Sequence, residues 1–241
     1  MNFFCGVKKP EYYKGLLMKA DMGLHAQIAD TIARVVPAGG KILDFGAGEG
    51  ALSLRLIDIG YQVVSVDKEE FDFQCNGAKF TRVDFDSPEE LNSFLTSHAG
   101  EFDAVLGIEV IEHVQDQWKY VRGLMAMVKQ GGTVLITTPN ISSWLSRFMF
   151  FFTGRFHGFG DSSLSYGHIH PISPWELNLI LKTLGAENIQ IGPAGTLPAI
   201  YLTNNRLTLF NLMVLPFRPF MRGILDGWCV MAVAQKPFLD V

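Results

Sequence analysis

The feature that most constrains the fold is an alternation of short apolar runs with amphipathic stretches between Lys41 and Thr138. Runs rich in β-branched residues, separated by helix-length segments, are typical of βαβ units with parallel strands. We therefore predict an α/β fold in which helices cover both faces of a parallel sheet. The predicted strands of this region are residues 41–45, 62–66, 79–83, 102–107 and 133–138.

The flanking segments extend this pattern into a single domain. Apolar residues at helical spacing predict a helix over residues 24–35, ended by Pro37-Ala38-Gly39-Gly40. A later helix over 173–184 and strands near 188–191 and 228–234 complete the chain. A length of 241 residues suits one domain. We expect a core over 24–140, with cap or substrate insertions at 141–172 and 192–227.

Composition argues against several classes of protein. The net charge of -4 lacks the basic excess of nucleic-acid-binding proteins. Three cysteines without a CxxC pair suggest neither a disulfide framework nor a thiolate zinc site. The first residues lack the order of a signal peptide, so we expect a cytoplasmic protein.

A glycine-rich loop follows the first predicted strand, in the sequence ILDFGAGEG at 42–50. Its GxGxG spacing differs from the GxGxxG that binds the pyrophosphate of a dinucleotide. Asp44 and Glu49 place carboxylates beside Gly46 and Gly48, where they would repel a pyrophosphate. The same carboxylates suit the ammonium and sulfonium charges of S-adenosylmethionine, which we predict as the cofactor.

Further acidic residues follow the next two strands. Asp67, with its neighbour Lys68, stands where an acidic residue binds ribose hydroxyls in nucleotide-binding βαβ units, although a single such residue can also cap a helix. Asp84 and Phe85 follow the third strand, where a carboxylate could bond the adenine amino group and a side chain could cover the ring. All four are predicted to bind the cofactor.

Five segments, taken in order along the chain, resemble the motifs of class I S-adenosylmethionine-dependent methyltransferases. They are ILDFGAGEG, VVSVD, the acidic pair around Phe85, FDAVLGIEVIEHV and GGTVLITTPN. The resemblance covers roughly residues 24–191. It implies a Rossmann-like, seven-stranded sheet whose last strand is antiparallel. It also implies direct methyl transfer by in-line displacement at the sulfonium.

Glu109, Glu112 and His113 follow the fourth strand, at the sheet edge where open α/β folds bind ligands. If a helix starts here, positions i, i+3 and i+4 share one face, and the three side chains form half of a metal site. His168 or His170 could complete it. Alternatively, the glutamates cap and solvate a helix start, and His113 is a packed or acid/base residue.

This constellation resembles two branches of the family, the ubiquinone-biosynthesis O-methyltransferases and the small-RNA terminal 2′-O-methyltransferases. The resemblance implies that Glu109, Glu112, His113 and His168 bind a divalent metal that orients substrate hydroxyls and lowers their pKa. Mixed nitrogen and oxygen ligands suit iron, manganese, zinc or cobalt. Without a metal, His113 or His168 could act as general base. Glu109, His113 and His168 are the predicted catalytic residues, and Glu109 is also a predicted cofactor ligand.

Two aromatic stretches, 144–152 and 207–220, lie in the insertions. Neither has the roughly 20 apolar residues that span a bilayer. The segment from Ile141 to Gly223 contains six lysines and arginines but only three acidic residues. These stretches either close the active site as ordinary packing or form an interfacial surface that reaches a lipid-linked substrate, with peripheral membrane contact.

The sequence as a whole favours an O-methyltransferase acting on a small, glycan or lipid-linked hydroxyl acceptor. Another possible enzyme is an RNA terminal 2′-O-methyltransferase, but the negative net charge of the chain argues against it. A protein that binds S-adenosylmethionine without turnover is the non-catalytic alternative, because a fold alone does not establish activity.

Overall fold

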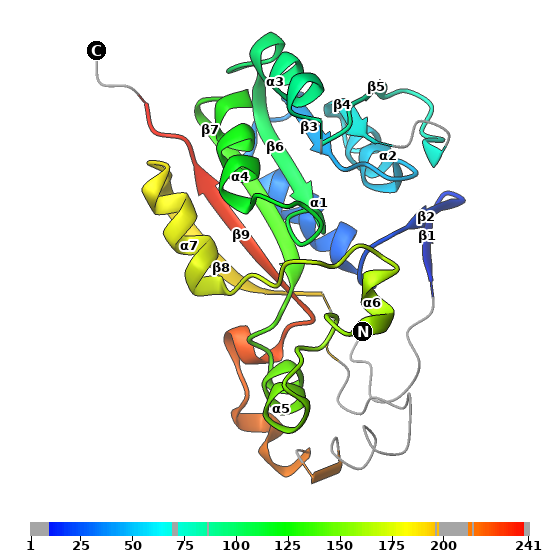
Figure 1. Cartoon of the computed structure of the whole chain (residues 1–241). Coiled ribbons are helices and arrows are strands. Elements are labelled where there is room, and N and C mark those ends of the chain that lie inside the picture. The colour runs from blue at the N-terminus through cyan, green and yellow to red at the C-terminus, as the bar shows by residue number, and fades with distance from the viewer. Residues whose placement is uncertain are drawn as a thin grey trace.

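The computed structural model describes residues 10–68, 72–85, 87–195, 197, 212–213 and 215–238. Seven strands form its central sheet in the order β5-β4-β3-β6-β7-β9-β8 (Figure 1). β9 pairs antiparallel with both β7 and β8, and the other pairs are parallel. The predicted Rossmann-like, seven-stranded sheet is confirmed. Its strands are β3 (Lys41–Phe45), β4 (Gln62–Asp67), β5 (Lys79–Arg82), β6 (Phe102–Ile108), β7 (Val128–Pro139), β8 (Glu187–Ala194) and β9 (Cys229–Gln235).

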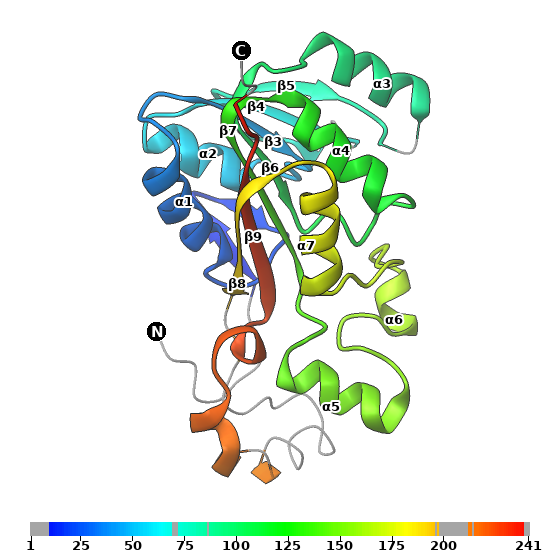
Figure 2. The same cartoon turned by 90° about the vertical axis from the view of Figure 1, so that its left-hand side faces the viewer.

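Helices cover both faces of the sheet, as Figure 2 shows. On one face, apolar side chains of α1 (Leu24–Val35) and α2 (Ala51–Asp58) pack against Ile42 and its neighbours. On the other, α3 (Pro88–Ser97), α4 (Gln117–Met127) and α7 (Pro174–Thr183) pack against Leu43 and its neighbours. Adjacent strand residues thus enter opposite cores, as the two-residue period of a strand requires.

A short hairpin precedes this domain and was not predicted. β1 (Glu11–Tyr13) pairs with β2 (Leu16–Met18) through the two-residue turn Lys14-Gly15. Both turn residues have positive φ, 49° and 92°, which suits the twist of a two-residue hairpin. The hairpin packs on α2 through Leu16 and Met18 and thereby reaches the glycine-rich loop.

The insertions form a lobe at one end of the sheet, beyond the carboxyl end of β7 (Figures 1 and 2). It contains α5 (Trp144–Thr153), α6 (Asp161–Leu164), η2 (Leu215–Phe220) and η3 (Gly223–Asp226). The Asn140 amide ties it to β7 by donating hydrogen bonds to the carbonyls of Ile224 and Gly227. Residues 207–211 and 214 of the second aromatic stretch lie outside the described residues. In the described part of the chain, no helix is both long and apolar enough to cross a membrane.

Candidate active site

The glycine-rich loop makes a tight turn between β3 and α2. Gly46, Gly48 and Gly50 all have positive φ, at 105°, 53° and 86°. A Cβ atom added to Gly46 would collide with the Val110 side chain, which follows β6. Only glycine therefore allows this turn to pass so close to the neighbouring strand end.

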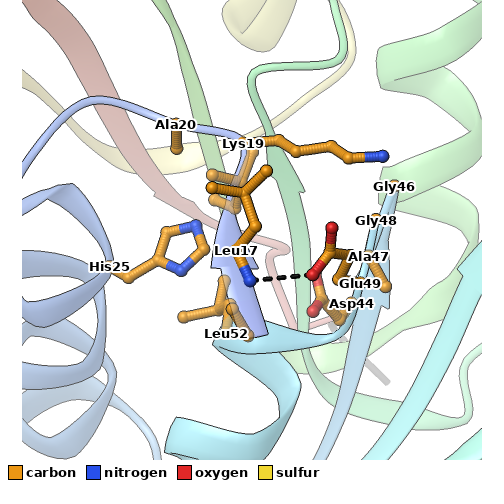
Figure 3. A pocket seen from close by; sticks show the side chains of 12 residues that line it. Leu17, Lys19, Ala20, His25, Asp44, Gly46, Ala47, Gly48, Glu49 and Leu52 are labelled. Atoms are coloured by element: carbon orange, nitrogen blue, oxygen red, sulfur yellow. Dashed lines mark hydrogen bonds between the residues drawn. The ribbon is translucent and has the colours of Figure 1, made fainter. Parts of the chain in front are cut away.

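A pocket opens between this turn and the N-terminal hairpin (Figure 3). Four of the residues that line it were predicted to bind the cofactor: Asp44, Gly46, Gly48 and Glu49. The Glu49 carboxylate accepts a hydrogen bond of 2.8 Å from the backbone N–H of Leu17 and so fixes β2 beside the turn. One oxygen of the Glu49 carboxylate thus positions β2, which forms a side of the pocket.

Asp44 contributes a buried carboxyl group at the base of the pocket. It is 1% exposed and accepts a hydrogen bond of 2.6 Å from the Ser53 hydroxyl, which lies 2.8 Å from Ser65 Oγ. Burial raises the pKa of Asp44 to about 6, although the Ser53 hydrogen bond opposes the rise. A cation entering the pocket would favour the ionised form of this group.

The other predicted cofactor residues meet at the carboxyl ends of β4 and β5. The Asp67 carboxylate accepts hydrogen bonds from the backbone N–H groups of Gly48 and Lys68, both 2.7 Å. Lys68 Nζ lies 3.5 Å from Asp84 Oδ1. Phe85 stacks on Phe45 with ring centroids 4.3 Å apart. The structure therefore brings these residues to one edge of the sheet, while their ribose and adenine roles stay predictions.

Among the pocket residues that were not predicted from the sequence, two have ionisable side chains, Lys19 and His25. Lys19 follows the hairpin, reaches across Gly48 and bonds the Asp72 carboxylate at 2.6 Å. His25 is buried in α1, and burial lowers its pKa to about 4, so the ring is neutral. The available signal was the Lys14-Gly15 pair between the tyrosines at 12 and 13 and the apolar triplet at 16–18, which indicates a hairpin that would carry Lys19 toward the loop.

A second cluster lies after β6 and consists of Glu112, His113 and His168. One potential ligand atom from each lies within 4.8 Å of the others. Glu112 is completely buried, and neither of its carboxyl oxygens has a hydrogen-bond partner within 3.5 Å, while His113 Nε2 lies 4.0 Å from Oε1. Burial, and to a lesser degree the charge of Glu109, raises the pKa of Glu112 well above its usual value. An unbonded buried carboxyl group is costly unless something pairs with it.

Glu112 and His113 lie in a turn, so the condition that a helix starts at Glu109 is not met. α4 begins only at Gln117, because the Asp116 side chain caps it by accepting a hydrogen bond from the Lys119 N–H. Glu109 has a φ of 53°, and its carboxylate accepts a hydrogen bond from the Cys229 thiol. Among the described residues, the cluster therefore joins three of the four predicted metal ligands and leaves out Glu109.

Backbone hydrogen bonds bring the distant His168 to the turn. The N–H groups of Ile169 and His170 both donate to the Glu112 carbonyl at 3.0 Å. His168 Nδ1 lies 2.9 Å from the Gly158 carbonyl, which can only accept, so this nitrogen carries a proton and Nε2 is left for a ligand. His170 instead lies against the Val114 carbonyl, at 2.9 Å.

His113 completes the cluster as a neutral imidazole. Its ring meets that of His168 edge to face, with centroids 4.8 Å apart. Burial lowers the pKa of His113, and the neighbouring His168 lowers it further. Neutral imidazoles beside a carboxyl group can ligate a metal or accept a proton from a hydroxyl.

Comparison with known proteins identifies the family. Residues 21–191 match a family model described as a methyltransferase domain, which covers more than half of the chain. The chain belongs to the class I S-adenosylmethionine-dependent methyltransferases. Family membership therefore assigns S-adenosylmethionine to this methyltransferase as its cofactor.

Curated relatives of this methyltransferase include the ubiquinone biosynthesis O-methyltransferases of Caulobacter vibrioides and Xanthomonas axonopodis. The first is 32% identical over 114 residues, covering 46% of this chain and 45% of that protein. The second is 31% identical over 112 residues, covering 45% and 46%. The methyltransferase thus spans about half the length of the curated relatives it matches.

Solved structures share the fold. A SAM-dependent methyltransferase from Archaeoglobus fulgidus superposes with a TM-score of 0.57 at 17% identity, covering 88% of this chain and 94% of that one. Phosphoethanolamine N-methyltransferase 2 of Haemonchus contortus, solved with S-adenosyl-L-methionine, gives a TM-score of 0.56 at 16% identity over 92% and 54% of the chains. At such identities the likeness concerns the fold alone.

Proposed function

We propose that this methyltransferase transfers a methyl group from S-adenosylmethionine to a hydroxyl oxygen of a small, glycan or lipid-linked acceptor, assisted by a divalent metal. The observation that carries the proposal is the buried Glu112 carboxyl group, without a hydrogen-bond partner, beside two imidazoles. This cluster follows β6, next to the strand whose carboxyl end forms the glycine-rich turn. The O-methyltransferase names of the curated relatives agree with an oxygen acceptor.

The residues of the cluster fit a metal. Glu112, His113 and His168 offer one oxygen and two nitrogens, a set suited to zinc, iron, manganese or cobalt. A cation there would satisfy the carboxyl oxygens that the protein leaves unbonded, and the Gly158 carbonyl already orients His168 from behind. A bound cation would polarise an acceptor hydroxyl and lower its pKa.

Residues of this chain are suited to bind both the methyl donor and the acceptor hydroxyl group. The acceptor oxygen forms a bond to the methyl carbon as the bond from carbon to sulfur breaks, which neutralises the sulfonium. The hydroxyl proton must leave. With the hydroxyl pKa lowered by a cation in the cluster, the proton can pass to water, and without a cation the neutral imidazole of His113 is suited to accept it. Buried Asp44 favours the positively charged donor over its neutral product.

Lys19 gives the donor pocket a cation opposite its carboxylates. It lies over Gly48 at the edge of the pocket, where an ammonium group can pair with the carboxylate of the methionine moiety. Asp44 and Glu49 lie on the side of the turn, where they suit the donor amino group. The pocket therefore offers both charges that an amino acid moiety requires.

Product analysis with a defined set of acceptors tests the proposal. The protein is incubated with labelled S-adenosylmethionine and either catechol, a long-chain alkyl catechol, or an RNA oligonucleotide ending in a free 2′-hydroxyl. Methyl ethers of the catechols, lost on adding chelator and restored by manganese or zinc, are expected. Methylation of only the RNA would support the 2′-O-methyltransferase alternative, and donor binding without any product would support the non-catalytic one.

Metal binding is tested separately, by equilibrium dialysis of the chelator-treated protein against zinc or manganese. His168→Gln removes a predicted ligand, whereas His170→Gln alters a histidine two residues away whose ring bonds the Val114 carbonyl. We expect the first variant to lose at least about tenfold in metal affinity and the second to bind like the wild type. Equal affinity of all three proteins would refute the metal site.

A further inference from the structure

Large apolar side chains are exposed on two segments of the lobe. Phe151 on α5 and Phe220 on η2 are each 82% exposed. Their exposed neighbours are also apolar, and we call the whole set the aromatic surface. It consists of Phe150, Phe151, Phe152, Leu215, Phe217 and Phe220. Isolated exposed apolar residues are ordinary, but a cluster of this kind marks an interaction site.

The two segments belong to one structural unit although they are far apart in sequence. Trp144 and Leu145 at the start of α5 are buried with Met221 and Trp228, which follow η2. The Arg218 guanidinium lies 5.1 Å from the centre of the Trp144 ring. These contacts join α5 to the segment around η2, while Phe151, Phe217 and Phe220 expose more than half of their surface to solvent. The two segments lie in the same lobe (Figures 1 and 2).

The charge around the aromatic surface is positive. The described residues of 144–169 and 212–227 include four arginines and two aspartates. Arg155 pairs with Asp161 at 2.7 Å, and Arg218 pairs with Asp226 at 2.8 Å. Within the described part of the lobe, Arg147 and Arg222 therefore remain without an acidic partner, on a protein whose net charge is -4.

We infer that the aromatic surface docks this methyltransferase on a bilayer that contains anionic lipids. Exposed phenylalanines insert favourably into the boundary between headgroups and acyl chains, and arginines meet the lipid phosphates. Insertion of this kind requires only a superficial apolar face, which agrees with the short lengths of α5 and η2. The positive charge beside the apolar face favours an anionic membrane over an apolar groove of another protein.

The chain between α5 and His168 links the aromatic surface to the cluster of Glu112, His113 and His168, which we call the acceptor cluster. Phe156 stacks on Phe150 with ring centroids 4.5 Å apart, and the His157 N–H donates to the Ser146 hydroxyl at 3.0 Å. After this contact the chain forms α6 and reaches His168. A docked molecule would thus hold its acceptor cluster near the membrane, which suits a lipid-linked acceptor. Only this last step rests on the proposed function, because docking itself requires no methyl transfer.

Co-flotation with vesicles tests the inference. Vesicles of phosphatidylcholine alone are compared with vesicles that also contain phosphatidylglycerol, using wild-type protein and the double variant Phe151→Ser/Phe220→Ser. Phe238→Ser is the matched control, since Phe238 is 76% exposed but follows β9, whose carboxyl end points away from the lobe (Figure 1). Binding of S-adenosylhomocysteine verifies that every variant is folded.

We expect the wild type and Phe238→Ser to float with the anionic vesicles and the double variant to partition at least about tenfold less. Arg147→Gln/Arg222→Gln should weaken binding to anionic vesicles and leave the residual binding to neutral ones unchanged. The inference is overturned if the wild type stays unbound at low salt, or if the double variant floats equally well. It is also overturned if sedimentation shows that the wild type self-associates through this surface and that the double variant does not.

Discussion

The backbone N–H of Leu17 donates a 2.8 Å hydrogen bond to the Glu49 carboxylate, which joins the N-terminal hairpin to the glycine-rich turn. The donor pocket lies between these two segments, so its shape depends on this bond (Figure 3). One acidic residue of the loop thereby positions a part of the chain that lies 32 residues before it.

Substitution of Glu49 separates this positioning role from a direct charge contact with the donor. Glu49→Ala removes the acceptor for the Leu17 N–H and should weaken S-adenosylhomocysteine binding about tenfold, equivalent to about 1.4 kcal/mol. Glu49→Gln keeps an acceptor oxygen and should bind within about threefold of the wild type. Calorimetric titration measures both, and an equal loss in the two variants would show that the charge matters instead.

The affinity for S-adenosylmethionine should depend on pH through Asp44. Its folded pKa of about 6 lies above the ordinary 3.8, so the donor-free fold retains the proton between these values and loses stability as pH rises through them. At neutral pH the raised pKa of Asp44 lowers the stability of the donor-free fold by on the order of 3 kcal/mol relative to an unperturbed carboxyl group, and a cationic donor partly offsets this loss. Donor affinity should therefore rise from pH 5 to 7, as titrations across that range would detect. Asp44→Asn should abolish this dependence, and an unchanged slope would contradict the role of Asp44.

Two glycines with similar backbone conformations should respond differently to alanine. Gly46 and Gly60 have φ values of 105° and 97°, but a Cβ atom at Gly46 meets Val110, whereas one at Gly60 meets nothing within 4 Å. Both variants should lose about 1 kcal/mol of unfolding free energy from backbone strain. Gly46→Ala should lose roughly 1 to 3 kcal/mol more from overpacking, together with donor binding. Denaturant unfolding measures the difference, and equal losses would refute the close approach at Gly46.

The proposed role of Lys19 predicts a selective loss of affinity. Lys19→Met should weaken S-adenosylhomocysteine binding about tenfold but leave binding of 5′-methylthioadenosine, which has no carboxylate, unchanged. Lys14→Met is the matched control, since Lys14 lies at the hairpin turn and pairs with Asp58 at 2.8 Å, outside the pocket. Competition titration compares the ligands. Equal weakening of both ligands in Lys19→Met would mean that the hairpin had merely been disturbed.

The sheet and the glycine-rich loop could be predicted because their signals are local. β-branched runs such as Val63 to Val66 and the three glycines after Phe45 each specify a backbone conformation within a few residues. The parallel direction of β3 to β7 then follows from the regularity of βαβ units, whereas the order of the strands in the sheet was not predicted. The family motifs reflect the same short segments, which explains why the resemblance and the fold agree.

The acceptor cluster could be predicted only in part, because its geometry depends on contacts between distant segments. The spacing of Glu109, Glu112 and His113 suggested one helix face, but the cap that starts the helix is Asp116, itself a recognisable signal. The contact of Glu109 with Cys229 joins residues 120 positions apart. No local pattern could have foretold that pairing, which places the Glu109 carboxylate outside the cluster.

The central claim is that the donor pocket and the cluster of Glu112, His113 and His168 serve one reaction. It is tested most directly by measuring methyl transfer under single-turnover conditions, with saturating donor and metal. With the alkyl catechol as acceptor, His168→Gln should slow transfer at least about a hundredfold while its S-adenosylhomocysteine affinity stays within about twofold of the wild type. His170→Gln should react at the wild-type rate. Transfer by His168→Gln at the wild-type rate would contradict the account.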